Sequence, residues 1–180
     1  TYPTIDNSTL VKIEDLKYPK IPHFAPSKVM HTAYRADYGP QFSVGIIEKQ
    51  PPELGPVYHG KVPQLDQFGN EFGGIRNVEL QVPLATYIPY NLRIGLAGEQ
   101  NELNDFYGTY IPFAKNLEEK NAKNDERPDI HSLYKNKESY LKKVKKAANK
   151  LIKQGFLLQE DRIYVMERAE KYWDFIIIPQ

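Results

Sequence analysis

Proline is distributed very unevenly along this chain, and the distribution limits the folds that the chain can adopt. Thirteen of the 14 prolines lie within residues 1–128, and only Pro179 follows them. Proline lacks a backbone donor and interrupts helices. We therefore predict a turn-rich, irregular first part over residues 1–128 and a helical second part over residues 129–180. Together they form one structural unit of the α+β class.

Short extended segments are expected in the first part. Residues 43–49 and 58–66 have the character of short strands, and residues 78–82 alternate strictly between apolar and polar side chains. That alternation has the period of a half-buried strand. The segment 66–70 lies between two extended runs and predicts a hairpin loop. The first part should therefore contain a small antiparallel sheet.

The second part carries clear helix signals. Asn136 can cap a helix whose apolar residues recur at steps of three and four, and Gly155 can end it with Phe156 in position for a hydrophobic contact. A second helix is predicted over about residues 159–173, with Ile163 and Trp173 on its apolar side. The two form a C-terminal helical hairpin, which must bury its apolar side on the first part or on another chain.

Charge and composition exclude several classes of function. The 24 Lys and Arg residues nearly balance 23 Asp and Glu residues, and the net charge of +1 gives no overall field that would collect nucleic acid or anionic lipid. Eight lysines do cluster over residues 135–153, but a solvated helix face explains them better than a nucleic-acid site. No apolar run approaches the length of a membrane span. We therefore predict neither a nucleic-acid partner nor a membrane span.

The absence of cysteine excludes disulfides, thiol catalysis and thiolate metal sites, and leaves the compartment open, export included. The four histidines show no metal-ligand spacing, and the glycines form no phosphate-binding motif. No serine lies in a G-x-S-x-G nucleophile elbow. Ser43 comes nearest, with Gly45 after it but Gln41 before it. We predict no catalytic residue, no metal and no cofactor in this chain.

Polar residues lie on both sides of the apolar segment around residue 84. They are Arg76, Thr86, Tyr87, Asn91 and Arg93. They can satisfy backbone groups and fill the core, or they can line a substrate pocket, with Arg76 either clamping a carboxylate or pinning two loops together. Both interpretations stay open at this point.

A series of short motifs resembles a known family in order and spacing. The motifs are YGPQF at 38–42, VPQLD at 62–66, GGIR at 73–76, VPLATY at 82–87, NLR at 91–93, GTYIPFA at 108–114 and RP at 127–128. They are similar to the C-terminal portion of the large bacterial α/β-hydrolase-domain proteins, which are esterase-like enzymes. Residues 88–90, IPY, depart from the more usual T-G-W-like step of that family.

The resemblance covers nearly the whole chain and has consequences for function. It implies that the serine, its acid and its histidine lie in a hydrolase core upstream of Thr1, in the same parent chain or in a separate polypeptide. This chain would then complete an enzyme that hydrolyses a small-molecule ester or related acyl bond, and would be catalytically silent alone. The start at Thr1 without an initiator Met leads us to expect a fragment or a processed chain.

Two other hypotheses remain. One is a stand-alone ligand-binding or protein-interaction module, in which the tyrosine-rich first part forms a groove; 13 tyrosines are compatible with that role, and equally with core packing. The other is an independent enzyme with an unfamiliar site.

Overall fold

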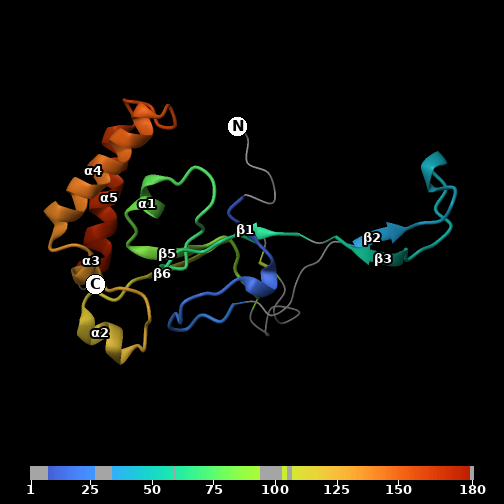
Figure 1. Ribbon diagram of the computed structural model, residues 1–180, viewed down its shortest axis with the longest axis horizontal. Helices are drawn as coiled ribbons and strands as arrows, with labels where there is room; N and C mark the ends of the chain where they lie inside the picture. Colours follow the sequence, from blue (N-terminus) through green and yellow to red (C-terminus); the bar gives the residue numbers. More distant parts are fainter. Residues whose placement is uncertain (1–7, 27–33, 59, 94–102, 105–106, 179–180) are drawn as a thin grey trace.

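The computed structural model describes residues 8–26, 34–58, 60–93, 103–104 and 107–178. In these residues the chain forms small two-stranded antiparallel sheets and a series of helices that ends in a long helix pair (Figure 1). The prediction of an α+β chain with a C-terminal helical hairpin is confirmed.

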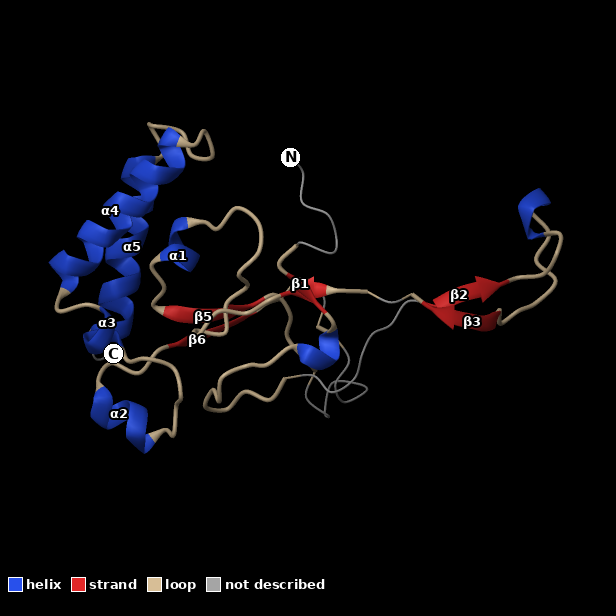
Figure 2. Cartoon of the chain, viewed as in Figure 1, coloured by secondary structure: helices blue, strands red, loops and turns tan. Residues whose placement is uncertain are grey.

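Each sheet is a separate pair of short strands. β1 (Leu10–Val11) pairs with β4 (Val62–Pro63), β2 (Tyr34–Asp37) with β3 (Glu53–Val57), and β5 (Ala85–Ile88) with β6 (Thr109–Pro112). The β2–β3 hairpin and the helix pair lie at opposite ends of the view in Figure 2, with β5 and β6 beside the helices.

Several short helices connect these strands. They are η2 (Ile13–Asp15), η3 (Phe42–Val44), α1 (Val78–Gln81), α2 (Leu117–Ala122) and α3 (Ile130–Leu133). α1, α2 and α3 each begin after an Asn or Asp whose side chain accepts a hydrogen bond from a backbone N–H of the first turn.

The predicted strand over residues 78–82 is wrong, because this segment is helix α1. Val78 and Val82 are both buried, and their spacing of four residues also suits one face of a helix. The side chain of Asn77 accepts a hydrogen bond from the Leu80 N–H and so begins the helix. An alternation of apolar and polar residues over only five positions therefore did not distinguish a strand from a helix.

The predicted extended segment over residues 43–49 is also wrong. It begins inside η3 and continues without strand pairing, while the strand of this region is β3. Val44, Ile46 and Ile47 are about half exposed or more, so no buried face supports a strand here. The 58–66 segment contains the two strand residues of β4 and Leu65, which forms an isolated antiparallel bridge with Glu71.

The hairpin loop over residues 66–70 is confirmed. The Asp66 N–H donates to the Asn70 carbonyl at 2.8 Å, and Gly69 adopts a left-handed φ of +76° that suits glycine.

The helix pair consists of α4 (Lys137–Lys153) and α5 (Arg162–Ile177). Asn136 caps α4 as predicted, within a capping box completed by Ser139. Gly155 ends the helix region with a φ of +78°, although the Phe156 ring stays 55% exposed. α5 begins later and ends later than predicted, and Ile163 is exposed rather than on the packed side.

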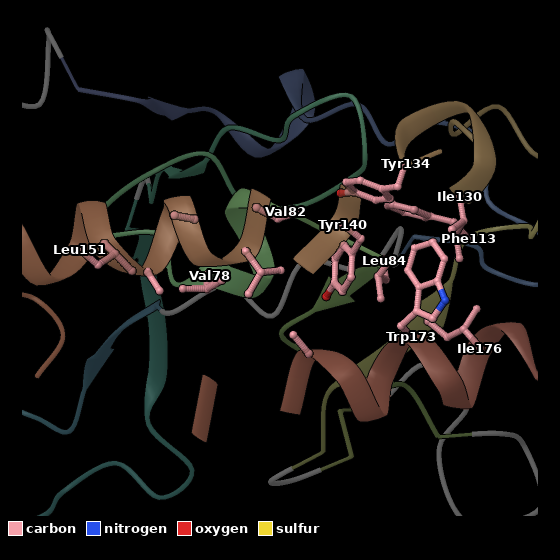
Figure 3. Packing of buried hydrophobic residues seen from close by; sticks show 14 residues of the cluster. Val78, Val82, Leu84, Phe113, Ile130, Tyr134, Tyr140, Leu151, Trp173 and Ile176 are labelled. Atoms are coloured by element: carbon pink, nitrogen blue, oxygen red, sulfur yellow. The ribbon is translucent and has the colours of Figure 1, made fainter. Parts of the chain in front are cut away.

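The hydrophobic core lies between the helix pair and the β5–β6 region (Figure 3). Val78, Leu84 and Phe113 from the first part pack in one cluster with Tyr140 and Trp173 from the helices. The rings of Tyr140 and Trp173 stack with centroids 5.3 Å apart. The two parts of the chain therefore share a core, while the boundary at residue 128 stays a prediction.

Candidate functional site

The outer edge of β5 is closed by the side chain of Asn70, which is fully buried. Its Nδ2 donates to the Ala85 carbonyl at 3.0 Å, and its Oδ1 accepts from the Tyr87 N–H at 2.7 Å. A neighbouring strand would use these same two backbone groups of that edge. The 66–70 loop thereby fixes the position of β5.

A buried guanidinium holds the β5–β6 pair together. Arg127 is 1% exposed and pairs with the Asp125 carboxylate at 2.7 Å. It also donates to the Thr86 hydroxyl at 2.8 Å and to the Ile111 and Pro112 carbonyls at 2.9 and 3.1 Å. The guanidinium is therefore hydrogen-bonded at Nε, Nη1 and Nη2, and loss of either member of the pair would leave the other charge buried without its partner.

Three tyrosines lie close together beside the β5–β6 pair. Tyr87 from β5, Tyr110 from β6 and Tyr172 from α5 line a groove of about 760 Å³, which we call the tyrosine groove. Ring centroids are 5.4 Å apart for Tyr87 and Tyr110, and 6.4 Å apart for Tyr110 and Tyr172. The remaining lining residues are Ile88, Gly108, Thr109, Lys171 and Phe175.

Two hydroxyls of the groove, those of Tyr87 and Tyr110, have pKa values raised above the usual value for tyrosine. Burial, with a smaller contribution from Tyr172, raises the pKa of Tyr110 to about 12. Burial also raises the pKa of Tyr87, with Tyr110 adding to the effect. Neutral phenols can donate hydrogen bonds, so the groove combines apolar ring faces with potential donors.

The predicted site residues do not converge on one pocket. Of the five, only Tyr87 lines the tyrosine groove, and Thr86 is fully buried in the Arg127 network. Asn91 lines a separate cavity of about 390 Å³, and Arg93 is exposed.

Arg76 pins two segments together. Its Nη2 donates to the Asp66 carboxylate and to the Leu80 carbonyl, both at 2.6 Å, which ties the 66–70 loop to α1. It also lines a cavity of about 450 Å³ beside Lys150 and Gln154 at the end of α4. A role in substrate binding stays a prediction for all five residues.

Sequence reasoning missed the residues that complete the groove. Tyr110, Lys171 and Tyr172 come from elements far from Tyr87 in the sequence, and no local motif connects them. GTYIPFA at 108–114, one of the family-like motifs, contains Tyr110 and was the only available signal.

Within the described ranges, no group of His, Asp and Glu side chains is arranged to hold a metal ion. None of the helices in those ranges combines the length and apolarity that crossing a membrane would require.

Comparison with known families decides the affiliation of the chain. The alpha/beta hydrolase domain family matches residues 28–167 of the 180. The chain belongs to this family. No curated protein and no solved structure matches it significantly.

A hydrolase of this type requires a serine at a sharp strand-to-helix turn. Three of the serines in the described residues lie elsewhere: Ser43 is in η3, Ser132 donates to the Asp129 carbonyl at 2.7 Å, and Ser139 caps α4. The full sequence contains no G-x-S-x-G. This member of the hydrolase family therefore lacks the usual nucleophile motif in its 180 residues.

Proposed function

We propose that this chain is a non-catalytic, C-terminal region of an α/β hydrolase, and that the whole enzyme cleaves an ester or a related acyl bond. One combination of observations carries the proposal. The hydrolase family matches residues 28–167, yet the chain contains no nucleophile elbow. A serine from outside these residues would perform the attack, with its own histidine and acid.

The small size of the sheets supports this role. A nucleophile elbow is built on a strand of an extended sheet, whereas the sheets of the described residues have two antiparallel strands each. They cannot supply that scaffold. The hydrolase core that this chain would complete is its proposed partner.

Exposed apolar side chains on α5 support a partner surface. Tyr164, Phe175 and Ile178 are 67%, 56% and 57% exposed, and they recur along one side of the helix with Arg168 and Lys171 between them. Apolar groups that gather on one surface commonly mark an interaction site. A hydrolase core that packs on this side of α5 would bury Tyr164 and Ile178 and would lie next to the tyrosine groove, which Phe175 lines.

A serine-directed fluorophosphonate probe tests the proposal. The natural full-length polypeptide that contains this sequence is labelled, digested and analysed by mass spectrometry, and its turnover of a short-chain nitrophenyl ester is measured. We expect the labelled serine outside residues 1–180, and no turnover by the isolated chain. A label on Ser8, Ser27, Ser43, Ser132 or Ser139 that abolishes turnover would overturn the proposal.

The alternative function is a stand-alone ligand-binding module. The observation that favours it is the tyrosine groove, whose lining residues in the described structure all come from this chain. If the native protein consists of this chain alone and hydrolyses no ester, the binding module becomes the better description.

A further inference from the structure

We propose that the tyrosine groove binds a ring-bearing, apolar monocarboxylate, whose ring lies against Tyr110, Tyr172 and Phe175 and whose carboxylate pairs with Lys171. The inference concerns binding by this chain itself and does not depend on the proposed hydrolase role.

The volume and lining of the groove fit a small molecule. Its volume of about 760 Å³ lies within the range of ligand sites, roughly 300–1,000 Å³. Half of the lining residues are aromatic, and of these Phe175 and Tyr110 remain 56% and 38% exposed. A flat ring placed against them would remove apolar surface from water on both sides of the contact.

The charge next to the groove selects an anion. Lys171 lines the groove and has no ion-pair partner anywhere in the described part of the chain. By contrast, Arg168 is paired with Glu79, and Lys137 is paired with both Glu170 and Asp174. Glu167, one turn before Lys171 on α5, is exposed and makes no ion pair with it. Among the residues that line the groove, Lys171 is the cation available to a ligand with one negative charge.

The hydroxyls provide the remaining polar contacts. The Tyr87, Tyr110 and Tyr172 hydroxyls make no hydrogen bond to another described residue. Because burial keeps Tyr87 and Tyr110 neutral, they can donate to an oxygen of the ligand. A ligand with an apolar ring and a carboxylate uses both features of the site, whereas a purely apolar ligand leaves Lys171 unpaired.

The test is a binding measurement on the 180-residue chain with three probes. 2-Naphthoate carries the ring and the charge, 2-naphthalenemethanol carries the ring alone, and acetate carries the charge alone. Dissociation constants come from isothermal titration, and the location of binding comes from changes in backbone amide NMR signals. We expect 2-naphthoate to bind about three- to tenfold more tightly than the alcohol, acetate to bind undetectably, and the Gly108, Thr109 and Lys171 signals to move most.

Two groove variants and one matched control separate the contributions. Lys171→Gln should weaken 2-naphthoate to the level of the alcohol and leave the alcohol unchanged. Phe175→Ala should weaken both ring-bearing probes, because it removes part of the apolar wall. Lys142→Gln removes the same charge from an exposed position on α4 and should change neither. Circular dichroism and thermal unfolding confirm that each variant is folded.

Three results would overturn the proposal. They are equal affinity of wild type and Lys171→Gln for 2-naphthoate, signal changes confined to residues outside the groove, and a groove already occupied by a second copy of the chain. The last would appear as changes in the same amide signals on dilution without any probe. None of these measurements involves ester turnover, so their outcome is independent of the hydrolase test.

Discussion

The guanidinium of Arg127 donates a 2.8 Å hydrogen bond to the hydroxyl of Thr86 in the interior of the protein. The contact connects the segment after α2 with the middle of β5, across 41 residues of sequence. Because Asp125 neutralises the same guanidinium, the strand pair that carries Tyr87 and Tyr110 is positioned by a buried charge pair.

Replacement of Arg127 by Met should strongly destabilise the protein. The substitution leaves the Asp125 carboxylate buried without its partner, and we expect the free energy of unfolding to fall by about 3–5 kcal/mol. Urea unfolding followed by the fluorescence of Trp173, the single tryptophan, measures the change. Lys123→Met breaks the exposed pair with Glu119 and should cost less than about 1 kcal/mol. Equal losses in the two variants would contradict the role assigned to Arg127.

Asn70→Ala should also cost stability, because the Asn70 side chain is fully buried and makes two hydrogen bonds to the backbone of β5. The Ala85 carbonyl and the Tyr87 N–H would each lose a partner, and we expect a loss of about 2–4 kcal/mol. Asn77→Ala is the matched substitution at an exposed helix cap, with an expected loss of about 1 kcal/mol. Chemical unfolding of both variants gives the comparison, and a smaller loss for Asn70→Ala than for Asn77→Ala would refute the prediction.

Gly108→Ala should disturb the tyrosine groove and the β5–β6 pairing together. A Cβ at this position would lie 2.8 Å from the Ile88 carbonyl oxygen, which is a backbone atom of the paired region and cannot move aside alone. We expect a loss of about 1–3 kcal/mol and changed NMR signals for Thr109 and Tyr110. Gly60→Ala meets no atom within 4 Å and serves as the control. Unchanged stability of the Gly108 variant would show that the strands tolerate a wider separation.

Stability should decline at alkaline pH. The pKa of Tyr110 is raised to about 12, and burial also raises the pKa values of Tyr134 and Tyr140. Tyrosines in the unfolded chain titrate near pH 10. The folded state therefore disfavours the phenolate form. The contribution of these neutral tyrosines to the free energy of unfolding is fully present below pH 10 and is lost as the pH rises toward 12.

Urea unfolding midpoints between pH 7 and 11 test this pH dependence, together with the absorbance of tyrosinate at 295 nm. The midpoint should be insensitive to tyrosine ionisation up to about pH 10 and should fall above it, and Tyr110→Phe should make the fall shallower. Tyrosine ionisation in the folded protein that is complete by pH 10.5 would contradict the assignment of these groups as buried.

Local signals allowed the two long helices, α4 and α5, to be predicted, whereas the short helices and most strands depend on long-range packing. Asn136 and Gly155 mark the ends of α4 by the chemistry of their own side chains and backbone, so the helix could be located without tertiary information. The 78–82 segment was ambiguous, because Val78 and Val82 fit either one face of a strand or one turn of a helix. Burial against α4 and capping by Asn77 decided in favour of the helix.

The candidate site was harder to predict than the fold. Tyr87 was singled out because polar residues follow an apolar segment there, but its neighbours Tyr110 and Tyr172 come from β6 and α5. Their convergence depends on how a sheet packs on a helix, which no short motif encodes. For Arg76, the sequence left two roles open: its bonds to Asp66 and Leu80 tie the 66–70 loop to α1, and a role in substrate binding stays a prediction.

Asn70 has a consequence for how a hydrolase core could join this chain. With the Ala85 carbonyl and the Tyr87 N–H both occupied by one amide, an additional strand at that edge would have to displace the Asn70 side chain. If the proposed hydrolase core met this edge without displacing Asn70, the seam would be formed by side chains and not by a continuous sheet. Such a seam depends on complementary side chains instead of the pairing register of backbone strands. The contacting residues on the two surfaces can therefore be substituted together without altering either fold.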